Sequence, residues 1–399
     1  MERIFKKNTK YKALLLSLLL SAIGFGLYKG VIDNYLAEVV GMMEMDRGVA
    51  EFFRELPGLL LIFIMAVLYR FSAEKLYKTG MIIMTAGMLL QAFVAPAKAL
   101  VIAAIFIYSL GEHMQLGMKQ TLSLEYSHPG KGGQALGRQS AVYQIGNLVG
   151  YLAVIAVVAL VAGKVIFKPV FVAAAAFIGL AMLVSFRLSG SSETDPAKRR
   201  FYFRRKFRKY YMLEVFYGAR KQVFFTFGPY VLILFYGADA GVISLLFAVS
   251  AISCFIFSPL VGKLIDRVGY KPVMIGDTLV LVIVCFFYGF AHHIFPMHTA
   301  FIICCVNYVL DSVISLASMA SNVYVQDISD SPEEMRATIS TGISVNHMIT
   351  ILIALLGGWI WKVLGIETLF ILSAFLGLCN SAYAATIKVP RKEKSVSGT

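Results

Sequence analysis

The sequence predicts an all-α integral membrane protein with twelve transmembrane helices in two pseudo-symmetric six-helix bundles. Hydrophobic residues make up 58% of the 399 residues and charged residues only 15%, which is too apolar for a soluble domain of this size. Apolar runs long enough to cross a bilayer, roughly 20 residues each, follow one another along the chain. A polar, basic stretch near the middle separates six of these runs from the other six.

The apolar runs are divided by short polar breaks. The twelve expected spans are residues 13–38, 48–70, 78–96, 99–126, 136–162, 168–188, 209–236, 240–262, 271–291, 299–325, 337–363 and 367–388. The first run follows several basic residues, as a signal peptide does, but it is too long and lacks a small-residue cleavage pattern. We therefore expect it to remain in the protein as the first helix.

The formal net charge of +14 could indicate nucleic-acid binding, but the placement of the basic residues indicates membrane topology instead. With both termini in the cytoplasm, the inner segments exceed the outer loops in lysine and arginine by about five to one, as the positive-inside rule requires. The outer loops would hold only Arg47, Lys98, Lys164, Lys168 and Lys362. We expect a bacterial cytoplasmic-membrane protein that is monomeric, contacts lipids and a small-molecule substrate, and binds no nucleic acid.

The polar stretch Gly190–Lys209 divides the chain into two halves. It contains the basic runs Lys198–Arg200 and Arg204–Lys206. The expected domains are an N-terminal six-helix bundle at 1–189, a basic cytoplasmic linker at 190–209 and a C-terminal six-helix bundle at 210–399.

The two halves echo each other in sequence. Arg138 stands at the start of the fifth span and Arg336 at the start of the eleventh, and Tyr108–Glu112 in the fourth span is matched by Tyr308–Asp311 in the tenth. Repeated six-helix units are one known way to build a transporter. The echoes support an internal repeat.

The segment Gly262–Pro272 reads GKLIDRVGYKP and resembles the signature loop of the major facilitator superfamily. The corresponding first-half segment, Arg70–Lys78, is degenerate, with Glu74 and Lys75 where the family has aspartate and arginine. The resemblance covers nearly the whole chain. It implies alternating access to a central cavity lined by the first and fourth helices of each half.

The resemblance also implies a cytoplasmic gate. Asp266, with its neighbour Arg267, would approach the start of the fifth helix and Arg138 when the protein faces outward, where the helix dipole favours negative charge. Glu74 would play the weaker equivalent part toward Arg336. The alternative is that these are solvated loop charges that follow the topology rule.

Charged residues inside the expected spans are functional candidates because a charge at the bilayer centre is costly, by roughly 2.5–3.5 kcal/mol. Many lie at helical spacing on single faces, as residues lining one cavity must. The candidate cavity residues are Lys29, Asp33, Tyr108, Glu112, Gln115, Lys119, Gln144, Asn147, Tyr217, Arg220, Lys221, Asn307, Asp311 and His347. Glu112 and Asp311 are the predicted proton carriers.

Several of these charges have a structural alternative. Lys29 and Asp33, four residues apart, could simply neutralise one another. Arg54 and Glu55 could lie at the membrane interface or pair with the first or eleventh helix. His347 could be a hydrogen-bonded packing residue.

We expect a proton-coupled secondary transporter for a small organic solute with an anionic or zwitterionic group, because Lys29, Lys119, Arg220 and Lys221 supply positive charge on or beside cavity faces. A proton-driven multidrug or cation exporter, and a non-transporting receptor or assembly partner of the same fold, remain alternatives. An enzyme is not expected, since no nucleophile–base pairing is evident. No cofactor and no metal site are expected, because the five cysteines fall inside predicted helices without metal-type spacing.

Overall fold

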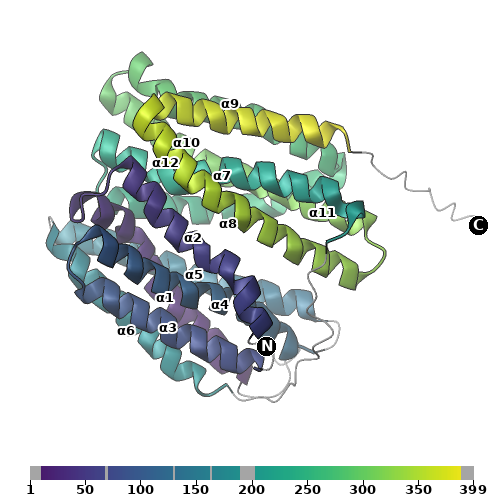
Figure 1. Cartoon of the computed structure of the whole chain (residues 1–399), viewed down its shortest axis with the longest axis horizontal. Helices are drawn as coiled ribbons and strands as arrows, with labels where there is room; N and C mark the ends of the chain where they lie inside the picture. Colours follow the sequence, from purple (N-terminus) through teal and green to yellow (C-terminus); the bar gives the residue numbers. More distant parts are fainter. Residues whose placement is uncertain (1–9, 68–70, 129–130, 162–163, 189–202, 388–399) are drawn as a thin grey trace, which may run out of the picture.

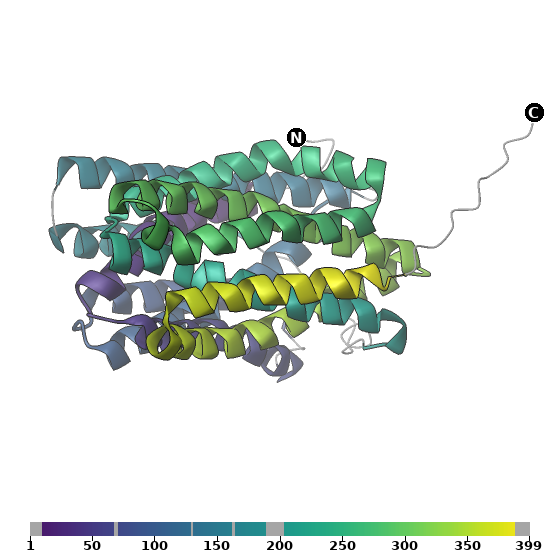
Figure 2. The same cartoon turned by 90° about the horizontal axis from the view of Figure 1, so that it is seen from above.

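The computed structural model describes residues 10–67, 71–128, 131–161, 164–188 and 203–387. The elements are α1 (Lys10–Glu38), α2 (Glu44–Val67), α3 (Ala73–Phe93), α4 (Lys98–Glu125), α5 (Gly132–Leu160), η1 (Lys164–Ile166), α6 (Phe167–Ser185), η3 (Arg205–Phe207), α7 (Arg208–Tyr236), α8 (Ala240–Val268), α9 (Tyr270–Ile294), α10 (Met297–Ile314), η4 (Ser315–Ser318), α11 (Met319–Ile328) and α12 (Pro332–Ala385). Helices α1–α6, the N-terminal group, gather on one side, and α7–α12, the C-terminal group, on the other (Figure 1). Turning the molecule shows that the long helices run roughly along one direction (Figure 2).

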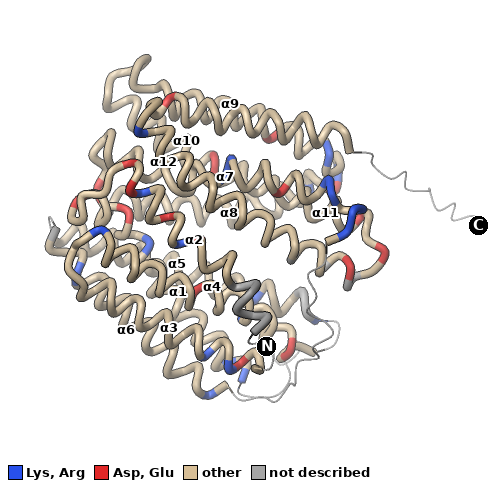
Figure 3. Tube along the Cα trace, in the orientation of Figure 1, with Lys and Arg blue, Asp and Glu red and all other residues tan. Residues whose placement is uncertain are grey.

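Nine helical segments within the described residues are long and apolar enough to cross a membrane. They include every long helix except α2 and α7, with α10 and α11 counted together. Both of those helices carry several charged residues along their sequences. In Figure 3, acidic and basic segments alternate along α2, whereas much of the remaining tube carries no charge.

Each expected span overlaps a helix, and the differences occur where helices join. The two last expected spans lie in the single element α12, which is broken at Gly365, whose φ of 88° is non-helical. The expected tenth span is interrupted by the 3-10 turn Ser315–Ser318, so its polar residues do not follow one continuous α-helical face. The expected signature loop is largely helical: α8 continues to Val268 and α9 begins at Tyr270, leaving only Gly269, with φ 89°, as the turn.

The two groups of helices meet mainly through α2 with α12, α5 with α8, and α1 with α7 and α8. Backbone and side-chain contacts seal one end, which we call the α1–α2 end. There Asn34 donates a hydrogen bond to the Ala238 carbonyl (2.8 Å), and Tyr230 donates to the Met42 carbonyl (2.6 Å). Slightly deeper, Ser244 donates to the carbonyl of Gly30 (3.0 Å). At the opposite end Arg138 and Asp266 are exposed.

We predict that Gly48→Leu loosens the seal at the α1–α2 end. A Cβ at Gly48 would lie 2.4 Å from the Ala354 carbonyl oxygen and 3.3 Å from Gly358 Cα, so a side chain must push α2 away from α12, at a typical cost of about 1–3 kcal/mol. In a background without native cysteines, a cysteine at the buried position Met42 should react faster with a thiol reagent. Gly117→Leu is the control because nothing lies within 4 Å of its Cβ position. Equal labelling rates in both variants would contradict the prediction.

Candidate functional site

One face of α2 carries a stripe of charged side chains into the interior. Arg47, Glu51, Arg54 and Gly58 are spaced by four, three and four residues, and Glu55 lies beside them. This spacing aligns side chains on one face of an α-helix. The stripe faces α1, α7 and α12 rather than lipid, because its ion pairs and hydrogen bonds are made with residues of those helices.

The stripe begins with Arg47, which links α2 to α1. Arg47 Nη2 lies 3.1 Å from Asp33 Oδ1, while Lys29 Nζ lies 2.9 Å from the other Asp33 oxygen. Arg47 Nη1 also donates to Glu51 Oε2 at 2.9 Å. Asp33 and Arg47 are both buried, so each charge depends on its partners rather than on solvent.

Glu51 is the centre of the network and is fully buried, with 0% of its surface exposed. Besides Arg47, it accepts from Arg54 Nη2 at 2.7 Å and from the amide of Gln222 on α7 at 3.1 Å. Gln222 in turn donates to Thr226 at 2.9 Å. Three donors therefore surround one carboxylate, two of them cationic.

The last charged residue of the stripe, Glu55, connects α2 to α12. Glu55 contacts Arg54 through one carboxylate oxygen, and its other oxygen, Oε2, lies 2.9 Å from His347 Nδ1 and accepts from Thr350 Oγ1 at 3.4 Å. The ring of His113 on α4 packs edge-on against His347, with ring centres 5.4 Å apart. The network thus runs from Lys29 in the N-terminal group to His347 in the C-terminal group.

Charges of opposite sign alternate along this path, which is the condition for burying them. An isolated buried charge costs several kcal/mol, and mutual attraction offsets that cost only where the geometry is close. Aromatic faces add to the neutralisation: the Lys29 ammonium and the Arg54 guanidinium lie 5.1 Å and 4.9 Å from the centre of the Phe225 ring.

A cavity of about 30 Å³ adjoins the network. Charged residues on its lining are Lys29, Asp33, Arg47, Glu51, Arg54 and Glu112. Since one water needs about 10–15 Å³ of such volume, roughly two waters fit. The cavity is too small for an organic solute in this conformation.

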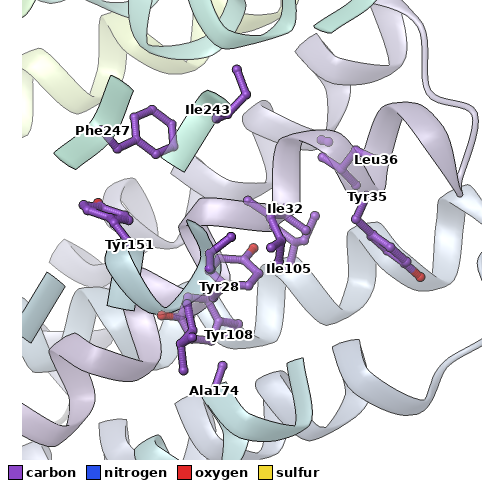
Figure 4. Packing of buried hydrophobic residues seen from close by; sticks show 14 of the residues in the cluster. Tyr28, Ile32, Tyr35, Leu36, Ile105, Tyr108, Tyr151, Ala174, Ile243 and Phe247 are labelled. Carbon is purple, nitrogen blue, oxygen red and sulfur yellow. The ribbon is translucent and has the colours of Figure 1, made fainter. Parts of the chain in front are cut away.

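The candidate residues of α1 and α4 have different surroundings. Lys29 and Asp33 form the ion pair described above. Tyr108 is buried against Tyr28, with ring centres 4.8 Å apart, and is part of the apolar core in Figure 4. Gln115 is also buried and donates to Ser21 at 2.9 Å. In this conformation Tyr108 and Gln115 pack inside the N-terminal group and do not line an open cavity.

Glu112 and Lys119 are the buried charges of α4 that have no ion-pair partner among the described residues. The Lys119 ammonium lies 3.9 Å from the centre of the Tyr143 ring. On α5, the amide of the buried Asn147 donates to the exposed Gln144 at 3.4 Å. Neither Glu112 nor Lys119 therefore has an oppositely charged side chain at ion-pair distance among the described residues.

The candidate cations of the C-terminal group differ in whether they form an ion pair. Arg220 is bound to Asp277 of α9 at 2.5 Å, whereas Lys221 is exposed and has no ion-pair partner within the described ranges. Tyr217 donates to the Ser315 carbonyl at 3.0 Å.

The two candidates on α10 differ in the same way. The Asn307 amide is used within its own helix, donating to Ile303 at 2.8 Å. Asp311 is half-buried, and no described residue forms an ion pair with it. Lys221 and Asp311 share with Lys119 and Glu112 the lack of an ion-pair partner among the described residues, but Lys221 is exposed whereas Lys119 is buried.

The expected gate residues are not joined in this structure. Asp266, Arg267 and Arg138 are exposed, and within the described part of the chain no ion pair connects them. Glu74 is buried in its own group, where Tyr126 donates to it at 3.4 Å. The side chain of Arg336 lies outside the described residues. Because the predicted contacts belong to an outward-facing state, the gate stays a prediction.

Sequence reasoning missed the centre of the network. Arg47 was assigned to an outer loop, which is wrong: it lies in the first turn of α2 with its side chain buried. Of the two alternatives for Arg54 and Glu55, pairing with the eleventh expected span describes Glu55, which binds His347. Glu51 was not singled out. The helical spacing of the charges along α2 was the signal that could have revealed the network. Because the expected span begins at residue 48, it excludes Arg47, the first of these charges.

We predict that Glu51→Ala destabilises the protein far more than Asp46→Ala on the same helix. Loss of Glu51 leaves Arg47 and Arg54 with fewer acceptors in the interior, and breaking a buried pair costs about 3–5 kcal/mol. Asp46 pairs with Lys98 at 2.6 Å at a partly exposed site, where a pair contributes at most about 1 kcal/mol. Thermal unfolding of the purified protein in detergent measures both. Similar losses of thermal stability in the two variants would contradict the prediction that the buried network contributes more to stability than the exposed pair.

Comparisons with known proteins bear on the fold and the family. The model of the Major Facilitator Superfamily matches residues 211–399. No curated protein sequence matches the chain. Among solved structures, the nucleoside transporter NupG aligns with a TM-score of 0.72 at 16% identity, covering 96% of this chain and 100% of that one.

Two further transporters have the same fold. A bacterial homologue of the human lysosomal transporter Spinster, inward-facing and occupied, aligns with a TM-score of 0.69 at 14% identity over 95% and 97% of the two chains. A mutant of the peptide transporter POT in complex with sulfate aligns with a TM-score of 0.71 at 12% identity over 94% of each. The second half of this chain thus matches the Major Facilitator Superfamily model, and nearly the whole chain shares the fold of these solved transporters.

Proposed function

We propose that this protein is a secondary active transporter that moves a small organic solute with an anionic or zwitterionic group by alternating access, driven by protons. The observation that carries the proposal is Lys119. It is a buried lysine over the Tyr143 ring with no ion-pair partner among the described residues. A buried cation without a partner is costly unless it binds something else. We infer that a solute carboxylate or phosphate is that partner.

The proposal includes twelve transmembrane helices. The nine apolar segments become ten when α12 is divided at Gly365, where its backbone is non-helical. The charged helices α2 and α7, each of more than 20 residues, would supply the other two. The halves would be 1–189 and 210–399, joined by the linker 190–209, most of which lies outside the described residues.

We also propose that the α1–α2 end faces outward, with both termini in the cytoplasm of a bacterial cell. The termini themselves lie outside the described residues. On this topology, the hydrogen bonds of Asn34, Tyr230 and Ser244 close the outer side. The exposed Arg138 and Asp266 lie at the inner side. The conformation would then be inward-facing.

Pairing within the protein decides which charges are free for the solute. Lys29 and Arg220 are each bound to an aspartate, which withdraws them from substrate binding. Lys119 and Lys221 are not paired within the described residues. They are the cations left to bind an anionic group.

Glu112 and Asp311 are the corresponding carboxylates without ion-pair partners among the described residues. They could carry protons, or they could bind the ammonium of a zwitterion. The same two carboxylates favour the second candidate function, export of organic cations. Only transport can separate these possibilities.

Purified protein in liposomes should accumulate labelled organic anions or zwitterions when an inward proton gradient is imposed, and should only exchange them without it. The panel should include simple carboxylates, amino acids, small peptides, phosphate esters and cationic dyes. Cation efflux without anion or zwitterion transport would overturn the proposal in favour of the exporter. No movement of any solute would favour the non-transporting receptor.

We predict that Glu112→Gln and Asp311→Asn remove proton-driven accumulation while leaving part of the solute exchange. An amide cannot release a proton, so coupling is lost although the binding site keeps its shape. Lys119→Met should reduce both accumulation and exchange, because it removes the cation that holds the solute. Lys98→Met, at an exposed pair, is the control. Full accumulation in both acid variants would exclude these residues from coupling.

We further predict that Asp266→Asn shifts the protein toward its inward-facing state without unfolding it. The expected pair with Arg138 forms only when the cytoplasmic side is closed, and a partly exposed pair contributes about 1 kcal/mol or less. Cysteines at the cytoplasmic ends of α5 and α8 should therefore label up to about fivefold faster. Lys263→Gln, another exposed charge on α8, is the control. Unaltered labelling together with full transport would discard the gate.

A further inference from the structure

We propose that Glu55, His113 and His347 form a binding site for a divalent transition-metal ion, located where α2, α4 and α12 meet. Each residue offers one ligand atom, and these atoms lie within 4.8 Å of one another. Two of the residues belong to the N-terminal group and one to the C-terminal group. Because three separate helices supply the ligands, no spacing in the sequence announces the site, and none was expected.

The hydrogen bonds of His113 leave one of its nitrogens ready to bind a metal. Its Nδ1 lies 2.9 Å from the carbonyl oxygen of Ser109. A carbonyl oxygen can only accept, so Nδ1 carries the proton and Nε2 of the neutral ring keeps its lone pair. The residue is only 5% exposed, and Nε2 has no hydrogen-bond partner among the described residues. A backbone carbonyl that fixes the far nitrogen is the usual outer-shell partner of a metal-binding histidine.

Glu55 is oriented in a comparable way. Arg54 holds one of its carboxylate oxygens, and the other, Oε2, faces His347 Nδ1 at 2.9 Å. Thr350 donates to the same oxygen at 3.4 Å. The carboxylate therefore presents a fixed oxygen beside an imidazole nitrogen, and a bound metal would take the place of the hydrogen bond between them.

Gly58 provides the room for an ion. A Cβ at this position would lie 2.8 Å from His113 Nε2 and 3.3 Å from His347 Nδ1. Because glycine has no side chain, the space that a Cβ would occupy beside both ring nitrogens is left for an ion. Metal–nitrogen bonds of about 2.0–2.1 Å would require the rings to close in by roughly 1 Å.

Two imidazoles and one carboxylate make a donor set suited to Zn²⁺, Co²⁺ or a related ion, with a fourth position left for water. The site bridges the two groups of helices, so it is complete only while α12 lies against α2 and α4. An ion that binds one conformation better shifts the population toward it. Metal binding should therefore hold the protein with its α1–α2 end sealed, whatever solute it transports.

A second cluster must be removed before the test. His292 and His293 on α9 lie 3.3 Å and 2.8 Å from the Glu367 carboxylate at a partly exposed surface, and such a cluster would also take up metal. The background protein therefore carries His292→Ala and His293→Ala. Titration of this full-length protein then reports the buried site.

The experiment is calorimetric titration of the background protein with Zn²⁺ alone, together with the visible absorption of Co²⁺. We expect one equivalent to bind, with tetrahedral Co²⁺ absorption. His113→Gln and Gly58→Ala, added separately, should each weaken binding by at least the roughly 10- to 100-fold that loss of an outer-shell partner costs. His298→Gln, at an exposed histidine outside the cluster, should change nothing. Thermal unfolding of the metal-free variants shows whether each is folded.

Absence of a saturable equivalent in the folded background protein would overturn the site, as would unchanged affinity in a folded His113→Gln variant. Conformational locking is read separately from thiol labelling of a cysteine at Met42 in the background protein freed of its native cysteines, which Zn²⁺ should slow unless His113→Gln is also present. Labelling that does not respond to bound Zn²⁺ would overturn the locking. Neither measurement requires transport, so failure of the proposed substrate class leaves the result interpretable.

Discussion

The need to neutralise the charges of α2 inside an apolar bundle constrains the rest of the structure. Glu51 is fully buried between two arginines, and each arginine has a second carboxylate, Asp33 or Glu55. No member can be withdrawn alone without leaving an uncompensated charge. These ion pairs fix how α2 lies against α1. The carboxylates of Glu51 and Glu55 also accept hydrogen bonds from side chains of α7 and α12.

Those hydrogen bonds come from groups of a different kind. Among the described residues, the lysine and arginine ion pairs of the network lie within α1 and α2, whereas its contacts across to the C-terminal group are made with Gln222, Thr350 and His347. Separation of the two groups therefore breaks hydrogen bonds of about 1.5–3 kcal/mol each to charged acceptors and leaves Arg47 and Arg54 with their carboxylates. Opening of the α1–α2 end, as alternating access would require, therefore breaks hydrogen bonds and leaves the lysine and arginine ion pairs of the network intact.

The sequence predicts the helices of this fold well and the pairing of its charges poorly. The helices follow from hydropathy because a bilayer needs long apolar runs. The partners of Arg220 and Glu55 could not be predicted, since Asp277 and His347 lie on other helices and only packing brings them close. Arg47 was misplaced because a charge beside an apolar run is normally a loop residue, and only its burial against Asp33 overrides that rule.

Pairing also explains why some of the predicted cavity charges differ in what they can do. The four cations proposed from sequence divide into Lys29 and Arg220, each held by an aspartate, and Lys119 and Lys221, which meet no carboxylate at ion-pair distance among the described residues. A paired cation contributes to the fold, because a solute would have to displace its partner and strand a buried charge. An unpaired one is stabilised by any anion that reaches it. Among the described residues, each group of helices keeps one such cation and one carboxylate, Glu112 or Asp311, without an ion pair. Under the proposed function, these are the charges for which solute and proton would compete.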